Sequence, residues 1–121
     1  MEIKFEELIK SVKAYNLLAD TKKIKKAWEF SKLAHTGQKR LTGEPFASHT
    51  LEVAFRLAQW KLDTTSIVVG FLHDTVEDGG ATRADIVKEF GEEVATLVDG
   101  VTKVTDLRLR GSRTQEFVEN L

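Results

Sequence analysis

The chain has 121 residues, a formal net charge of −1 and no cysteine. This length suits one domain with a single core, the balanced charge gives no reason to expect a nucleic-acid or membrane partner, and the lack of cysteine excludes disulfides and thiolate chemistry. No apolar run is long enough to cross a bilayer and the first residues do not form a secretory signal, so we expect a cytoplasmic protein. With 41% hydrophobic residues, 31% charged residues and one proline, the composition is typical of a folded helical protein.

The N-terminal part of the chain predicts two helices followed by a loop. Apolar residues recur at helical spacing within residues 3–18, and a second helix should run from a cap at Asp20 or Thr21 to Gly37. Residues 37–48 show no periodic pattern and contain glycines and the only proline, so we expect an ordered loop there. Loops of this kind commonly carry functional residues on a rigid scaffold.

The middle of the chain predicts a third and a fourth helix. The third should begin near Ser48 and end at about Trp60, and Asp63 should cap the fourth. The fourth helix is strongly apolar and is expected to continue into residues 71–80, which read FLHDTVEDGG. Four ionisable groups at the end of a buried helix break the apolar pattern, and such breaks are expected at functional sites.

The C-terminal part of the chain carries two further capping patterns. Thr82 should cap a short helix that Gly91 stops, and another helix should follow directly. Ser112 and Gln115 form a capping box for a last helix, which the chain leaves unfinished at Leu121. We therefore expect an all-α fold that belongs to a longer, C-terminally truncated domain.

The ionisable groups of the fourth helix predict a metal site. If this stretch is helical, His73 lies over Glu77 and Asp74 over Asp78. With His49 from the third helix, two imidazoles and one carboxylate suit manganese, iron, cobalt or zinc. A ligand set left open to water can generate hydroxide near neutral pH, and the acidic pair can orient or deprotonate that water.

Taken singly, the same residues have ordinary structural explanations. A His-Asp dipeptide is common, and a lone histidine at a helix end is more often a structural residue than a ligand. Glu77 and Asp78 can equally be the solvated end of a helix. Lys39 and Arg40, in the loop, would supply positive charge for an anionic substrate.

Three segments together resemble a known family. They read AHTGQKRLTGEPFASH at 34–49, FLHDTVED at 71–78 and FGEEVATLVDGVTKV at 90–104. From about residue 24 to the end, the chain resembles the HD-type hydrolase domain of the RelA/SpoT family, the synthetases and hydrolases of guanosine tetra- and pentaphosphate. The resemblance implies that residues 1–121 form part of one HD-domain helical bundle.

The resemblance also implies roles for the site residues. His49, His73 and Asp74 match metal ligands, usually of manganese. Glu77 and Asp78 match a catalytic acidic pair that positions the attacking water. The implied reaction is hydrolysis of the 3′-pyrophosphate of ppGpp or pppGpp, which gives GDP or GTP and belongs to the stringent response.

The loop residues match a nucleotide-binding segment. Arg40 matches an arginine that packs on the guanine base, with Lys39, Leu41 and Thr42 beside it. His35 matches a frequent position of the family that is not a ligand, so we interpret it as a helix-end histidine.

The sequence departs from the family pattern in three places. Proline usually follows the histidine at position 49, where this chain has Thr50. Lysine or serine often follows the arginine at position 40, where it has Leu41. The family's fourth metal ligand, an aspartate, lies beyond Leu121. We therefore expect weak metal binding and slow hydrolysis, and self-association through the apolar surface that missing helices leave exposed.

Two other functions remain open from the sequence. One is an HD phosphohydrolase that acts on another nucleotide, such as NADPH. The other is a non-catalytic regulatory or interaction module that keeps the helical scaffold. The intact acidic pair favours an enzyme, whereas the missing fourth ligand favours the module.

Overall fold

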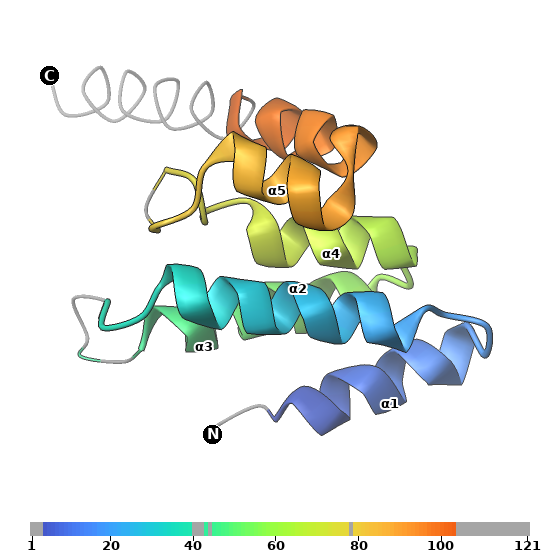
Figure 1. The fold of residues 1–121 in the computed structure, drawn as a ribbon. Helices are drawn as coiled ribbons and strands as arrows, with labels where there is room; N and C mark the ends of the chain where they lie inside the picture. The colour runs from blue at the N-terminus through green and yellow to red at the C-terminus, as the bar shows by residue number, and fades with distance from the viewer. Residues whose placement is uncertain (1–3, 40–42, 44, 78, 104–121) are drawn as a thin grey trace, which may run out of the picture.

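The computed structural model is a bundle of helices, and it describes residues 4–39, 43, 45–77 and 79–103 (Figure 1). Within these ranges there is no β-strand, and Lys39 and Pro45 form an isolated bridge. The expected all-α fold is thereby confirmed. The helices are α1 (Phe5–Tyr15), α2 (Thr21–Ala34), α3 (Phe46–Gln59), α4 (Thr64–Leu72), α5 (Arg83–Phe90) and an unlabelled helix at 92–103.

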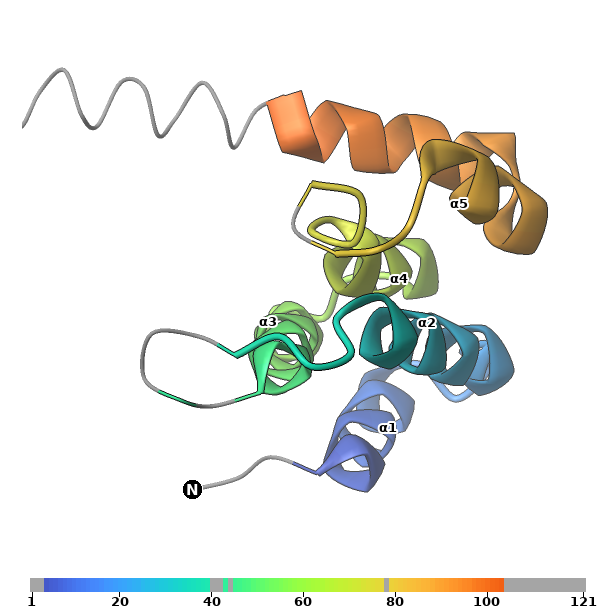
Figure 2. The same cartoon turned by 60° about the vertical axis from the view of Figure 1, so that its left-hand side comes forward.

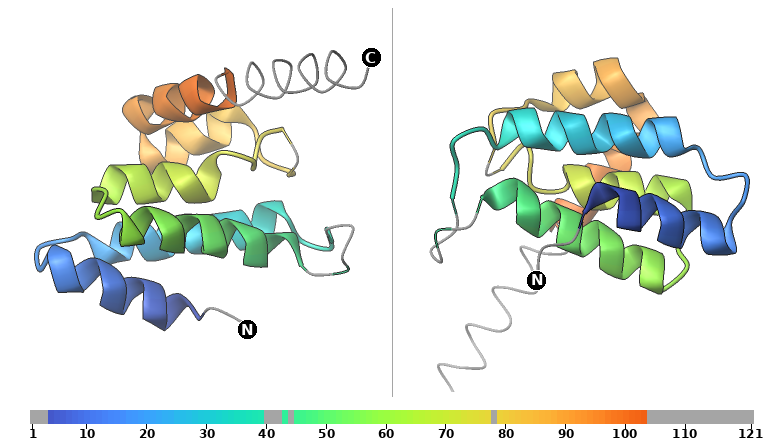
Figure 3. Two further views of the ribbon diagram at one scale, coloured as in Figure 1. Left: turned by 180° about the vertical axis from the view of Figure 1, so that it is seen from behind. Right: turned by 90° about the horizontal axis from the view of Figure 1, so that it is seen from below.

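Helix α4 is the centre of the bundle. It packs against α2 and α3 on one side, and α5 lies on its other side (Figure 2). A helix that is apolar all round must be covered all round, which explains the long apolar run seen in the sequence. Helix α1 packs on the outer face of α3 (Figure 3). The buried residues of α4 are Ile67, Val68, Val69, Gly70, Phe71 and Leu72.

Three of the predicted helix starts are confirmed by their capping bonds. The Asp20 side chain accepts a hydrogen bond from the Lys23 amide at 3.1 Å, and that of Asp63 accepts from the Ser66 amide at 2.8 Å. Thr82 begins α5 with a capping box. Caps of this kind typically stabilise a helix by about 1 kcal/mol each.

Helix α3 begins two residues earlier than predicted, at Phe46 rather than Ser48. Its N-cap residue is Pro45, which makes no side-chain capping bond. Thr50 permits this early start because, unlike proline, it has an amide hydrogen for the carbonyl of the residue four positions before it. The departure from the family pattern at position 50 is therefore compatible with a helix that begins at Phe46.

Helix α1 occupies the middle of residues 3–18, where the apolar residues have helical spacing. It ends at Tyr15, and Leu17 and Leu18 beyond it are 85% and 95% exposed. The Tyr15 hydroxyl donates to the Leu62 carbonyl at 2.6 Å, which ties the end of α1 to the turn before α4.

Within the described residues, no helix is both long and apolar enough to cross a membrane.

Candidate functional site

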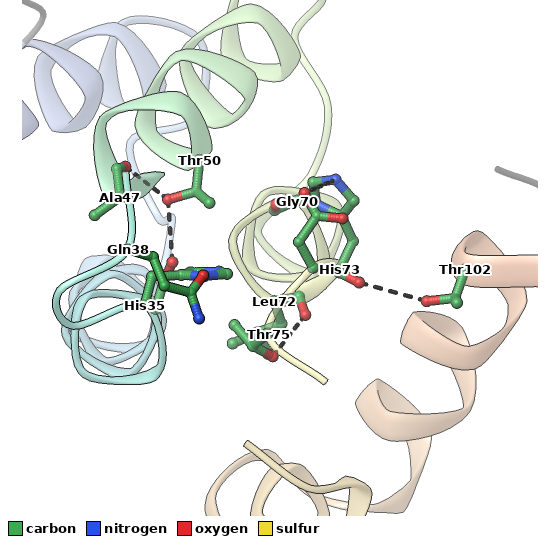
Figure 4. A network of polar contacts seen from close by, with 11 residues as sticks. His35, Gln38, Ala47, Thr50, Gly70, Leu72, His73, Thr75 and Thr102 are labelled. Atoms are coloured by element: carbon green, nitrogen blue, oxygen red, sulfur yellow. Dashed lines mark hydrogen bonds and ion pairs between the residues drawn. The ribbon is translucent and has the colours of Figure 1, made fainter. Parts of the chain in front are cut away.

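The candidate site lies where the end of α2, the start of α3 and the turn after α4 meet (Figure 4). A hydrogen bond of 3.0 Å between the hydroxyls of Ser31 and Thr50 joins α2 to α3. A backbone bond of 2.8 Å from the Gly80 amide to the Ala34 carbonyl joins the turn to α2. Residues from three distant parts of the sequence are thereby brought together.

The fourth helix ends within residues 71–80, as predicted, but too early for the stacking that a helix through residue 78 would give. Helix α4 ends at Leu72, and residues 73–77 form turns. The amide and the hydroxyl of Thr75 both donate to the Leu72 carbonyl, at 3.1 and 2.8 Å. In a continuing α-helix that carbonyl would accept from residue 76, so the closer donors end the helix. Residues 73–77 consequently lack the expected stacking of side chains four positions apart.

The turn after α4 folds back tightly onto α2. The Ala81 amide donates to the Thr75 carbonyl at 3.1 Å, beside the bond between Gly80 and Ala34. A Cβ atom on Gly79 would lie 2.6 Å from the Thr75 carbonyl oxygen and 3.1 Å from that of Ala34. Because both obstacles are backbone atoms, only glycine leaves room for this approach.

His73 and Asp74 are in direct contact. The His73 Nε2 atom lies 3.0 Å from Asp74 Oδ2, and its Nδ1 lies 2.7 Å from the Gly70 carbonyl oxygen. Both oxygens can only accept, so both contacts are favourable together only in two cases. Either the ring carries hydrogens on both nitrogens, or a cation takes the place of the hydrogen on Nε2.

The spacing of this pair fits a shared cation. Two ligands at right angles around an octahedral ion, each at about 2.1 Å, lie about 3 Å apart. The distance between His73 Nε2 and Asp74 Oδ2 is 3.0 Å. A metal-binding imidazole usually donates its second N–H to a carbonyl or carboxylate, as His73 does to Gly70. The donor atoms therefore suit a divalent metal that accepts nitrogen and oxygen ligands.

Two further histidines act on Asp74 electrostatically. Burial by itself would raise the pKa of Asp74. The hydrogen bond from His73 and the electrostatic influence of His73, His49 and His35 outweigh that effect and lower the pKa of Asp74 below its ordinary value. His49 is therefore within electrostatic reach of the pair, on the side where α3 begins.

The predicted three-ligand set is only partly assembled. Among the described residues, no group of three His, Asp or Glu side chains is gathered closely enough to hold a metal ion. His73 and Asp74 touch each other, whereas His49 contacts the ring of Phe46 at a centroid distance of 5.9 Å. The structure thus contains a pair of candidate ligands in contact, with a third candidate nearby.

The other predicted site residues are placed less completely. Glu77, on the turn after α4, and Lys39, in the loop before α3, are both exposed. Four more lie outside the described residues: Asp78, Arg40, Leu41 and Thr42.

The His35 side chain is more deeply buried than the sequence indicated. It is the C-cap residue of α2, as expected, but its side chain is buried and its residue is only 3% exposed. Its Nδ1 lies 3.0 Å from Gln38 Oε1, and its ring stacks on Phe46 at a centroid distance of 4.4 Å. In the described part of the chain, its Nε2 is buried without a hydrogen-bond partner. Helical periodicity held a signal for this, because position 35 lies four residues after the buried Ser31.

A groove of about 630 Å³ opens beside the site, between α3, α4 and the helix at 92–103. His73 forms part of its wall, and half of the other lining residues are aliphatic. Leu97 and Val101 line it and are 43% and 39% exposed. The Thr102 hydroxyl donates to the His73 carbonyl at 3.4 Å, so this helix also borders the site.

The sequence matches the HD domain family over residues 27–121. It is 48% identical over 106 residues to the GTP pyrophosphokinase of Myxococcus xanthus. It is 40% identical over 112 residues to the guanosine-3′,5′-bis(diphosphate) 3′-pyrophosphohydrolase of Aquifex aeolicus, and 41% identical over 105 residues to the protein of the same name from Spiroplasma citri.

These similarities cover most of this chain and a small part of the relatives. They span 88%, 93% and 86% of the chain, in the same order, but only 14%, 16% and 14% of the relatives' lengths. The resemblance drawn from the sequence motifs is thereby confirmed at the level of the family.

Proposed function

This chain belongs to the HD domain family, and from that premise we propose that it is a metal-dependent guanosine-3′,5′-bis(diphosphate) 3′-pyrophosphohydrolase. The substrates would be ppGpp and pppGpp, and the products GDP or GTP together with pyrophosphate. The names of its relatives support this choice of substrate. The observation that carries it is the contact between His73 and Asp74, whose geometry suits a shared cation.

His49, His73 and Asp74 would hold the metal, which we propose to be Mn²⁺. When bound, such an ion lowers the pKa of a coordinated water and supplies a hydroxide near neutral pH. The Gly70 carbonyl orients the His73 ring so that Nε2 faces the Asp74 carboxylate. The His49 side chain would need to move to join the pair.

Glu77 and Asp78 would act as general base and general acid in the hydrolysis. One carboxylate accepts a proton from the attacking water, and one carboxylic acid returns a proton to the ribose 3′-oxygen as it leaves. Glu77 is exposed on the turn after α4, where substrate and solvent have access. In this proposal, the residues that transfer protons are different from the residues that bind the metal.

The loop before α3 would bind the nucleotide. Lys39 and Arg40 offer positive charge to the phosphates, and the Arg40 guanidinium can stack on the guanine base. Leu41 and Thr42 would complete the segment. A nucleotide substrate and a chain without cysteine fit the expected cytoplasmic location.

The proposal is tested with two variants that separate metal binding from catalysis. We expect His73→Ala to weaken Mn²⁺ binding by at least about tenfold, measured by calorimetry, because a direct ligand is lost. We expect Glu77→Gln to bind Mn²⁺ like the wild type but to release pyrophosphate from ppGpp about 10²-fold more slowly. Unaltered turnover in both variants would contradict the assignment.

The non-catalytic module is retained as a second candidate because of one observation. No three candidate ligands are gathered into a metal-binding group within the described residues. A folded wild-type protein that takes up no Mn²⁺ and hydrolyses no ppGpp would favour the module. Hydrolysis of NADPH but not of ppGpp would instead favour a different nucleotide substrate.

A further inference from the structure

We propose that four residues form a clamp between α2 and α3 that positions His49 for metal binding. Ser31 and His35 on α2 contact Thr50 and Phe46 on α3, respectively. We call these four residues the α2–α3 clamp. The inference rests on the proposed function, because it takes His49 to be a ligand, and it assigns positioning roles to residues that do not themselves touch the metal.

The first contact of the clamp is a directed chain of hydrogen bonds. The Thr50 hydroxyl donates to the Ala47 carbonyl at 2.8 Å, which uses its one hydrogen. In the 3.0 Å contact with Ser31, Thr50 Oγ1 must therefore accept and the Ser31 hydroxyl must donate. Ser31 and Thr50 are both fully buried. Water cannot replace a lost partner at such a position, so the contact resists displacement.

The second contact is an aromatic stack that is fixed from two directions. The rings of His35 and Phe46 lie 4.4 Å apart between centroids, at an interplanar angle of 29°. Gln38 holds both partners, because its side-chain oxygen lies 3.0 Å from His35 Nδ1 and its carbonyl accepts from the Phe46 amide at 3.1 Å. The Phe46 ring in turn meets the ring of His49 edge-on, at 5.9 Å and 75°. The stack is thus connected directly to the candidate ligand.

The two contacts have matching helical spacing. Residue 31 on α2 and residue 35 at its C-cap are four apart, and residues 46 and 50 are four apart on one face of α3. Two contacts one turn apart hold the start of α3 against α2 at two points and so oppose its rotation more than one contact would. Figure 4 shows Ala47 and Thr50 at the start of α3, next to His35 and Gln38 at the end of α2. His49 lies between the two contacts in the sequence, so its direction is set by both.

If the His49 side chain is already held in place, it loses little conformational freedom when the metal binds. Residues that orient a metal ligand typically change metal affinity by about 10- to 100-fold when they are removed. The clamp also accounts for Thr50 as the residue after His49, because proline has no hydroxyl to receive the hydrogen bond from Ser31. We therefore place Ser31 and Thr50 among the residues that determine the metal affinity of this chain.

The test compares variants that remove one hydroxyl with a variant that removes a distant one. Ser31→Ala and Thr50→Val each break the hydrogen bond of the clamp, while Thr50→Ser keeps a hydroxyl at the same position. Tyr15→Phe is the matched control, because it removes the bond from Tyr15 to the Leu62 carbonyl at the other end of the bundle. All four are measured in the full chain.

Two measurements are made on each variant. In the metal-free protein, NMR reports the ring-proton shifts of His49, which the nearby Phe46 ring displaces from their random-coil values. Calorimetry reports the dissociation constant for Mn²⁺. We expect Ser31→Ala and Thr50→Val to change the ring-proton shifts of His49 and to weaken Mn²⁺ binding about tenfold. Thr50→Ser and Tyr15→Phe should keep both, and the double variant Ser31→Ala/Thr50→Val should bind no more weakly than the weaker single variant.

The clamp and the proposed function fail in different ways. Folded Ser31→Ala and Thr50→Val proteins that keep both the His49 shift and the wild-type affinity would overturn the clamp. A wild-type protein that binds no Mn²⁺ would overturn the metal site, while the His49 shift in the metal-free variants would still decide whether the clamp orients this ring. If Thr50→Val does not fold, Ser31→Ala, which removes only the donor of the same bond, decides the outcome.

Discussion

The two ends of α4 are built in opposite ways. At its start, the Asp63 side chain accepts a hydrogen bond from the Ser66 amide three residues later, in an exposed position. At its end, the chain turns at Thr75 and is bonded through Gly80 to the carbonyl of Ala34 on α2. The cap at the start is thus supplied by a neighbour in the sequence, whereas the turn after the end is bonded to a different helix.

This difference shows where precision is needed. A local cap stabilises a helix but does not place it relative to other helices. The end of α4 carries His73 and Asp74, whose use depends on their position relative to α2 and α3. Contacts with α2 provide that position, and they make the end more sensitive to substitution than the start.

We expect the largest effect from Gly79→Ala, which adds a side chain in the turn after α4. The new Cβ would lie 2.6 Å from the Thr75 carbonyl oxygen and 3.1 Å from that of Ala34, and both are backbone atoms. Forcing extra volume into a packed site typically costs about 1–3 kcal/mol, and we expect the upper end of that range. Urea unfolding measures the loss, and it should be accompanied by weaker Mn²⁺ binding.

Gly100→Ala is the matched control for this substitution. Gly100 lies in the helix at 92–103, and a Cβ there would meet nothing within 4 Å. Alanine is a better helix former than glycine by about 1 kcal/mol, so this variant should be slightly more stable than the wild type. Equal losses in the two variants would show that crowding at the turn is not the cause.

We expect a smaller effect from Asp63→Ala, which strikes the start of α4. Loss of the cap should lower the free energy of unfolding by about 1 kcal/mol, without a change in Mn²⁺ affinity. Asp63→Asn should keep most of the stability, because asparagine caps helices about as well as aspartate. A change in metal binding in either variant would contradict the separation between the two ends.

The Asp63 cap should also respond to pH. The hydrogen bonds from the Ser66 hydroxyl and amide lower the pKa of Asp63, and they outweigh the opposite effect of slight burial. Because the pKa is lower in the folded state, the charged cap stabilises the protein fully above the unfolded pKa of about 4. That contribution is lost as the pH falls through the lower folded value. Unfolding measured between about pH 6 and pH 3 should show a smaller loss in Asp63→Asn than in the wild type.

We expect the smallest effect from Gly70→Ala, inside α4. A Cβ at Gly70 would lie 2.6 Å from Leu57 Cδ1, which is the far end of a flexible side chain beside the groove. Rotation of Leu57 can relieve this contact, and the better helix propensity of alanine offsets the remaining cost by about 1 kcal/mol. The net change in unfolding free energy should therefore be near zero. A loss as large as that of Gly79→Ala would mean that side-chain and backbone obstacles are equally costly here.

Helix positions and caps could be predicted because their causes are local. Asp20, Asp63 and Thr82 cap helices as expected, and the apolar run of the fourth helix is buried as expected. The end of that helix could be predicted only to within residues 71–80, because the pattern of that stretch is compatible with a helix that continues past Leu72. Only the competition of Thr75 for the Leu72 carbonyl, together with the contact to α2, ends it.

For the candidate site, too, some features followed from the sequence and others only from the tertiary structure. The sequence by itself determined the residue types, the all-α fold and the family, because spacing and motif are properties of neighbouring residues. The tertiary structure decided that His73 and Asp74 touch, that His49 stands nearby against Phe46, and that His35 is buried at the same place. These facts depend on how α2, α3 and α4 pack, and packing is set by contacts between residues far apart in the chain, which no local pattern encodes.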